Sequence, residues 1–265
     1  MLVCTKCNST QENGQFCANC GGELVPQEGA EEAAATQQTT AEPNQGQTQQ
    51  PNPTVEKAKK ELGNYWNFIL DYIKAPTKGL NAPSNLLIFG IITLALYAIT
   101  YSLSNYFVAN RAYRNLAGFF GTSDSIPFFE TFFQDLLLII VLILAGIVSA
   151  FIMMKVAKVN ISFQDVVTQV GTLSTPYLAV NLLAIITSLA GLIVFTSTLL
   201  LVGFFLLIVI TPTLLVFEKT TQANVDGQRY YYSIGTVLLI FLFNYIVFRF
   251  IFESIVSDIP FLDFF

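Results

Sequence analysis

A stretch of 52 residues without a single Asp, Glu, Lys or Arg constrains this chain more than any other feature. It runs from residue 166 to residue 217, between Asp165 and Glu218. An α-helix rises about 1.5 Å per residue, so one helix of this length would be more than twice as long as the roughly 30 Å hydrocarbon core of a bilayer. The stretch therefore predicts two membrane spans that fold back on each other.

The composition of the whole chain indicates an apolar environment. Only 12% of its 265 residues are charged, 24 are phenylalanine, and the mean hydropathy is +0.57. These values lie far from the balance of soluble domains and indicate membrane lipids as the surroundings. The net charge of −5 argues against nucleic acid as a partner, because phosphate binding depends on clustered Lys and Arg.

Hydropathy predicts five spans in residues 84–257, and hence an all-α polytopic membrane bundle of five transmembrane helices. The spans run from about Leu86 to Phe107, Phe132 to Met154, Gln169 to Ala190, Leu192 to Phe217 and Tyr232 to Ile255. Gly191 marks the hinge between the third and fourth spans, which nothing polar separates. Pro176 and Pro212 are expected to kink these two spans.

All four cysteines lie in one short polar head, as Cys4-x2-Cys7 and Cys17-x2-Cys20. Two such pairs can place four thiolates in a tetrahedron, so residues 1–24 are predicted to form a small N-terminal zinc ribbon with one structural Zn2+ ion. Two disulfides would need an oxidising compartment, and a redox pair is expected singly beside a βαβ unit. The N-terminus lacks the apolar core of a secretory signal, which favours zinc.

Zinc ribbons often bind nucleic acid, but here Lys6 stands against Glu12 and Glu23, so the surface is not basic. A module that docks a protein partner and an inert cap both fit the head. Residues 25–53, rich in Gln, Thr, Pro and acids, have too few apolar side chains to fold and are expected to be a disordered tether.

Residues 54–75 have helical periodicity, with an apolar stripe that contains Tyr65, Trp66 and Ile69. An aromatic stripe beside lysines suits the headgroup layer, which favours an amphipathic interfacial helix. The alternative is a helix packed on the bundle with this stripe as ordinary core. Pro76 and Pro83 are expected to end the helix.

Basic residues predict the orientation. Nine of them flank the spans on the side of the N-terminus: Lys57, Lys59, Lys60, Lys74, Lys78, Lys155, Lys158, Lys219 and Arg229. Three, Arg111, Arg114 and Arg249, lie on the other side. The chain is therefore expected in the cell membrane with its N-terminus cytoplasmic and a short tail, residues 258–265, outside. The aromatic loop 109–131 is expected to dip into the outer interface.

No enzyme signature is found: histidine is absent, and no Gly-rich phosphate loop or nucleophile elbow occurs. Near the predicted membrane midplane lie the neutral polar residues Tyr97, Asn181 and Asn244, which favour interhelical contacts over a substrate site. The charged residues Asp135, Arg249 and Glu253 fall near the outer interface. Arg249 and Glu253 are four apart and share a helix face, and Asp135 is a candidate to join them.

Two short motifs carry a resemblance to the Yip family of five-span membrane proteins. "GTLSTPYLAV" resembles that family's G-x-x-x-x-P segment at the third span, here Gly171 and Pro176, and "NYWNFILDYIKAP" resembles its aromatic pre-membrane segment. The resemblance covers about residues 64–256 and implies a five-span fold. The Asp-Leu-aromatic-Gly-Pro motif of the Rab-binding eukaryotic members is absent, so no Rab partner is implied. A zinc ribbon on such a body resembles bacterial proteins.

These observations favour a non-enzymatic plasma-membrane scaffold that organises membrane proteins or lipids, with the zinc ribbon as a cytoplasmic docking module. The alternatives are a small-molecule or lipid permease that the ribbon regulates, and a zinc or redox sensor. The sequence leaves the formation of an oligomer open.

Overall fold

The computed structural model describes residues 2–4, 9–18, 21–26, 53–121, 125–225 and 227–257, and it describes side chains within these ranges except at 26, 53–59 and 251–257. The chain divides into two compact units, Met1–Pro53 and Thr54–Phe265. Several predictions lie outside the described residues: Cys7, Cys20, nearly all of the tether and the 258–265 tail, and also the Glu253 side chain.

The first unit contains a three-stranded antiparallel sheet in the order β2-β1-β3. Its strands are β1 (Leu2–Cys4), β2 (Thr10–Gln11) and β3 (Leu24–Pro26). Val3 pairs with Thr10 on one side and with Val25 on the other. Strand β3 continues to Pro26, beyond residue 24, and the predicted bounds of the head stay a prediction.

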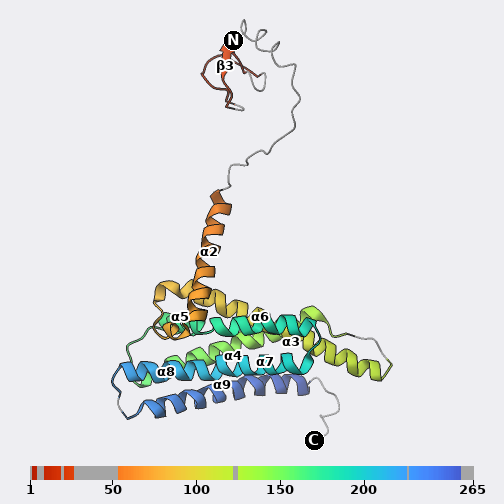
Figure 1. Ribbon diagram of the computed structural model, residues 1–265, viewed down its shortest axis with the longest axis vertical. Helices are drawn as coiled ribbons and strands as arrows, with labels where there is room; N and C mark the ends of the chain where they lie inside the picture. Colours follow the sequence, from red (N-terminus) through yellow and green to blue (C-terminus); the bar gives the residue numbers. More distant parts are fainter. Residues whose placement is uncertain are drawn as a thin grey trace. The chain divides into compact units, whose positions relative to one another are not determined.

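The second unit is helical throughout its regular structure (Figure 1). It begins with α2 (Pro53–Lys74), then the short 3-10 turns η2 (Pro76–Asn81) and η3 (Ser84–Leu86). The bundle follows with α3 (Leu87–Phe119), α4 (Phe128–Val156), α5 (Phe163–Leu173), α6 (Thr175–Leu189), α7 (Ile193–Phe205), the π-helical η4 (Leu206–Ile210), α8 (Thr211–Gln222) and α9 (Arg229–Ser257). The prediction of an all-α bundle is confirmed for this unit.

Four helices in the described part of the chain are long and apolar enough to cross a membrane: Ser84–Phe119, Phe128–Val156, Ile193–Gln222 and Arg229–Phe250. A fifth candidate is the pair α5 and α6, which meet at a 45° bend and form either a broken span or a re-entrant loop. These five segments coincide with the five predicted spans. The geometry of this bent pair fits both a full crossing of the membrane and a re-entrant loop.

The helix breaks occur where the sequence places proline and glycine. Pro176 stands in the first turn of α6, directly after the 45° bend between α5 and α6, where a missing N–H costs no helical bond. Gly191 turns the chain between α6 and α7 with a φ of 79°, a backbone region that glycine adopts without strain. The predicted kink at Pro176 and the hinge at Gly191 are therefore confirmed. Pro212 follows the π-helical η4 within one continuous helical span, and its predicted kink stays a prediction.

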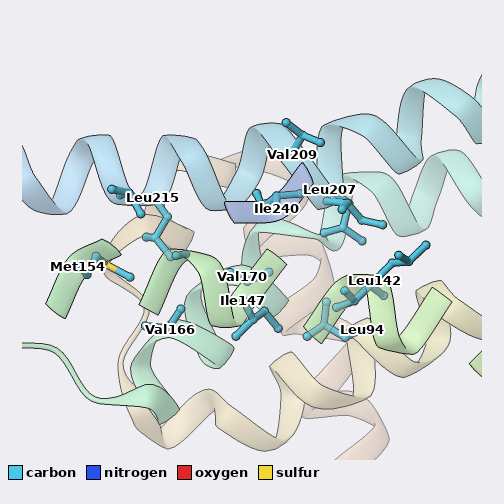
Figure 2. Packing of buried hydrophobic residues seen from close by; sticks show 14 of the residues in the cluster. Leu94, Leu142, Ile147, Met154, Val166, Val170, Leu207, Val209, Leu215 and Ile240 are labelled. Atoms are coloured by element: carbon cyan, nitrogen blue, oxygen red, sulfur yellow. The ribbon is translucent and has the colours of Figure 1, made fainter. Parts of the chain in front are cut away.

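The bundle core is one cluster of aliphatic side chains contributed by α3, α4, α5, η4, α8 and α9 (Figure 2). Leu142, Ile147 and Met154 line the inner face of α4, and Leu207 and Leu215 approach them from η4 and α8. Outside the core, large apolar side chains remain exposed: Ile88, Leu137, Leu201, Leu238 and Phe241 are between 56% and 69% exposed. An apolar outer surface of this kind is what a lipid-facing bundle requires.

Helices α3 and α5 touch through their backbones at two glycines. A Cβ on Gly171 would lie 2.5 Å from the carbonyl oxygen of Gly90 and 2.6 Å from its Cα. A Cβ on Gly90 would lie 3.2 Å from the Thr168 carbonyl oxygen. Only glycine permits so close an approach, as small residues commonly do between membrane helices. The two glycines thus determine how closely α3 and α5 pack.

The prediction of a loop over residues 109–131 is wrong for most of this range. Helix α3 continues to Phe119, and α4 begins at Phe128, so only a short connection remains. Asn110 and Tyr106 hold this connection at Ile126: the Ile126 N–H donates to Asn110 Oδ1 at 3.2 Å, and the Tyr106 hydroxyl donates to the Ile126 carbonyl at 3.2 Å. The first predicted span ends at Phe107 because polar and charged residues follow it. Helix α3 nevertheless continues through these residues to Phe119.

Candidate functional site

Of the polar residues predicted near the membrane midplane, Tyr97 and Asn181 lie in contact. The Asn181 Nδ2 on α6 donates to the backbone carbonyl of Tyr97 on α3 at 3.3 Å, and both residues have no exposed surface. The Tyr97 hydroxyl and the Asn181 Oδ1 each lie 3.8 Å from the point that a Cβ on Gly203 of α7 would occupy. Three helices therefore meet at this contact, which agrees with a structural role for Asn181.

Aromatic residues extend the contact along α3. The Tyr97 and Tyr101 rings stack with centroids 6.0 Å apart, and Tyr101 packs on Phe204 at 5.9 Å. On the neighbouring elements, Thr211 donates to the Tyr177 hydroxyl at 3.2 Å. These rings fill the space between the helices and leave the polar atoms enclosed.

Buried hydroxyl groups in the bundle bond mostly to their own helices. Thr100 donates to the Leu96 carbonyl at 2.7 Å, and Ser104 donates to the Thr100 carbonyl at 2.8 Å. Ser149 on α4 does the same with the Ala145 carbonyl at 2.7 Å. Such hydroxyls are satisfied within one helix and do not offer a row of groups to a passing solute.

The charged residues predicted near the outer interface are not all brought together. The Asp135 carboxylate on α4 faces Ser102 and Asn105 of α3, which sequence reasoning did not connect with it. Asn244 on α9 has a buried Oδ1 without a hydrogen-bond partner among the described residues. The expected grouping of Asp135 with Arg249 and Glu253, and the role of Asn244, stay predictions.

The aromatic stripe of α2 divides into a buried and an exposed part. Phe68 and Ile69 are buried against Leu178, and the Tyr65 hydroxyl lies 3.1 Å from Thr93 Oγ1 of α3. Burial raises the pKa of the Tyr65 phenol, and the hydrogen bond with Thr93 opposes this shift. Trp66 is 61% exposed. Tyr65 and Ile69 thus follow the packed alternative, while a headgroup contact of Trp66 stays a prediction.

In the head, the backbones of the two described cysteines make matching hydrogen bonds. The Cys4 N–H donates to the Ser9 carbonyl at 3.0 Å, and the Cys17 N–H donates to the Gly22 carbonyl at 2.7 Å, so each bond spans five residues. Both side chains are buried beside Leu24. No group of three or more metal-binding side chains occurs among the described residues, which leave out Cys7 and Cys20.

Two cavities lie at opposite ends of the bundle. A cavity of about 500 Å³ is lined on α3 by Phe107, Asn110, Arg111, Arg114 and Asn115 and on α6 by Ser188 and Leu189; we call it the Arg111 cavity. A cavity of about 340 Å³ lies among Asp165, Gln169, Lys219 and Gln222. Sequence reasoning missed both, although the two arginines on the side with few basic residues were a signal for the first.

Two residues that line the second cavity also make polar contacts with a distant segment of the chain. Lys219 Nζ donates to Asn81 Oδ1 at 2.8 Å, and Gln222 Nε2 donates to the same atom at 3.2 Å. Asp165, the last charge before the uncharged stretch, caps α5: its N–H donates to Ser162 Oγ at 3.1 Å, and its carboxylate accepts from the Ser162 N–H at 3.2 Å. These charges hold helix ends in place.

The fold and these buried contacts define the class: a membrane-embedded helical bundle that follows a small β-sheet unit. Residues 56–257 match the family described as "Domain of unknown function (DUF6574)", and the chain belongs to this family. It is also similar to "Uncharacterized protein YvbI" of Bacillus subtilis (strain 168), with 24% identity over 185 residues, which cover 69% of this chain and 68% of that protein. No solved structure matches the chain.

Proposed function

We propose that this protein is a non-enzymatic integral membrane protein. Its bundle would act as a Yip-like scaffold that organises membrane proteins or lipids, and its head would be a cytoplasmic zinc ribbon that docks a protein partner. The observation that carries the scaffold role is the closed centre of the bundle, where Tyr97 and Asn181 have no exposed surface. Neither cavity at the bundle ends is lined by these residues.

The resemblance to the Yip family gains support from the place of its two marker residues. Gly171 forms a close backbone contact with Gly90 of α3, and Pro176 starts the helix after the 45° bend. Both residues thus have structural tasks that a related five-span fold would share. The missing Rab-associated motif leaves the partner to be found by experiment.

The zinc proposal rests on the chemistry of the four thiols and on the matching backbone hydrogen bonds of Cys4 and Cys17. Cys4, Cys7, Cys17 and Cys20 would hold one ion, and four sulfur ligands leave no open position for a water, which makes the ion structural. Zinc thiolates persist on the reducing side of a membrane, so the head would lie in the cytoplasm. Lys155, Lys158 and Lys219 near one end of the bundle agree with this side.

Replacing Asn181 with leucine is expected to lower stability by about 1 kcal/mol, since one buried interhelical hydrogen bond is lost. The measurement is the melting temperature of the purified protein in detergent. Thr198→Val, which changes an exposed hydroxyl on α7, serves as the control and is expected to leave the melting temperature unchanged. A specific uptake defect of Asn181→Leu at unchanged stability would favour the permease instead.

The docking role is tested by crosslinking in native membranes, followed by pull-down of the full chain and of a variant that lacks residues 1–26. We expect at least one protein to be recovered with the full chain and to fall to background with the deletion. The deletion ends at Pro26 because β3 ends there. An unchanged set of recovered proteins would refute docking through the head and leave the cap or sensor alternatives.

A further inference from the structure

The Arg111 cavity is positively charged and stands at one end of the bundle. Its described lining contains two arginines and no acidic residue. Phe107, Asn110, Arg111 and Arg114 follow one another at spacings of three, one and three residues, so they share one face of α3, which points toward the end of α6. Such a lining suits an anion with several oxygen acceptors.

The Arg111 side chain contacts the turn between α6 and α7. A Cβ on Gly191 would lie 2.5 Å from Arg111 Cζ and 2.8 Å from both its Nε and Nη2, so the guanidinium lies flat against this glycine. Asn110 is fixed, because its Oδ1 accepts the Ile126 N–H. Its Nδ2 donor therefore has a defined direction. A preorganised amide loses little freedom on binding.

The depth of the cavity relates it to the lipid headgroups. About 20 residues of helix span the roughly 30 Å hydrocarbon core, so a span that begins at Leu87 leaves it near Phe107. Arg111 then lies roughly 6 Å further along the axis, within the headgroup layer of about 5–8 Å, and Arg114 lies roughly 10 Å along, just beyond this layer. The apolar side chains of Phe107 and Leu189 form the part of the lining nearest the membrane.

We propose that the Arg111 cavity binds a phosphate group, and that this group is the phosphodiester of an anionic phospholipid. Arginine guanidinium groups form paired hydrogen bonds with phosphate oxygens, and the amides of Asn110 and Asn115 supply further donors. The ester arms of the lipid would pass Phe107 and Leu189 into the membrane. The proposal requires that the bundle is embedded in the bilayer and does not depend on the zinc head or on docking.

The test uses the purified full chain in a neutral detergent with equal amounts of phosphatidylglycerol and phosphatidylcholine of the same acyl composition. Native mass spectrometry measures the lipid retained. We expect about a tenfold preference for phosphatidylglycerol, since charge-assisted bonds to phosphate are the stronger class and each 1.4 kcal/mol is tenfold in affinity. Arg111→Gln with Arg114→Gln is expected to remove this preference.

The control is Lys74→Gln with Lys78→Gln, which removes the same charge from exposed lysines outside the cavity. It is expected to keep the preference. If the double arginine variant does not fold, Arg114→Gln alone is used, because Arg111 also packs on the turn. A preference that survives the arginine changes, or one that the lysine control loses equally, would overturn the proposal.

Inorganic phosphate distinguishes the two sources of the phosphate group. In the same neutral detergent, we expect phosphatidylglycerol to raise the melting temperature of the unmodified chain and millimolar phosphate to leave it unchanged. An increase with inorganic phosphate as large as with the lipid, lost in the arginine variant, would overturn the lipid assignment and assign the cavity to a soluble phosphate compound.

Discussion

Replacing Gly171 with alanine is expected to separate helices α3 and α5 and to destabilise the bundle by about 1–3 kcal/mol or more, the range of overpacked cores. The added methyl would lie 2.5 Å from the Gly90 carbonyl oxygen. The obstacle is backbone and not a side chain, so no rotamer change can relieve it. The melting temperature of the purified protein in detergent measures the loss.

Gly118→Ala is the matched control, because it adds the same methyl group to a helical glycine with nothing within 4 Å. Alanine favours a helix over glycine, so this variant is expected to be neutral or more stable by up to about 1 kcal/mol. The two substitutions should therefore shift the melting temperature in opposite directions. Equal shifts would show that the contact of α3 with α5 does not determine stability.

Cys17→Ser is expected to reduce bound zinc from about one ion per chain to nearly none, because a neutral hydroxyl does not replace a thiolate ligand. Cys17 is 3% exposed and lies with Cys4 and Leu24 in the core of the head, so the head should unfold with the loss of metal. Metal analysis of the purified chain gives the zinc content, and protease sensitivity of the N-terminus reports unfolding.

Ser9→Ala controls for this experiment, since the Ser9 Oγ lies 3.1 Å from the Cys17 sulfur without being a predicted ligand. It is expected to keep one zinc ion. The melting temperature of the bundle should be the same in both variants, because the head and the bundle are separate compact units. Failure of the Cys17→Ser chain to insert into membranes would contradict this independence, and full retention of zinc would contradict the ligand set.

Much of the bundle could be predicted because its signals are local. The absence of charge between Asp165 and Glu218 identifies two spans, and proline and glycine mark their breaks regardless of the neighbours. The extension of α3 to Phe119 could not be predicted in the same way. Polar residues such as Asn110 interrupt the apolar signal of a hydropathy plot. The helix continues past Asn110, whose side chain accepts the Ile126 N–H.

The candidate sites required contacts between distant residues, which one sequence does not provide. Asn181 could be singled out as an amide in an apolar helix, whereas its partner, the Tyr97 carbonyl, is a backbone atom that any residue would supply. The Arg111 cavity combines α3 with residues about 77 positions later, Ser188 and Leu189. In the sequence, Arg111 and Arg114 could be recognised only as basic residues on the predicted outer side of the membrane, where few basic residues occur.

The π-helical segment η4 accommodates one extra residue within its span. Five residues, Leu206–Ile210, form this wider turn, and Thr211 Oγ1 donates to the carbonyl of Leu206, five positions earlier, at 2.9 Å. The wider turn takes up about one residue more than an α-helical turn, which is worth about 100° of rotation. It leaves Leu215 buried and Glu218 outside the buried set. Because the wider turn absorbs this extra residue, a homologous chain one residue shorter at this point would form a regular α-helical turn and keep Leu215 on the buried face, so a single-residue length difference within this span is expected at η4.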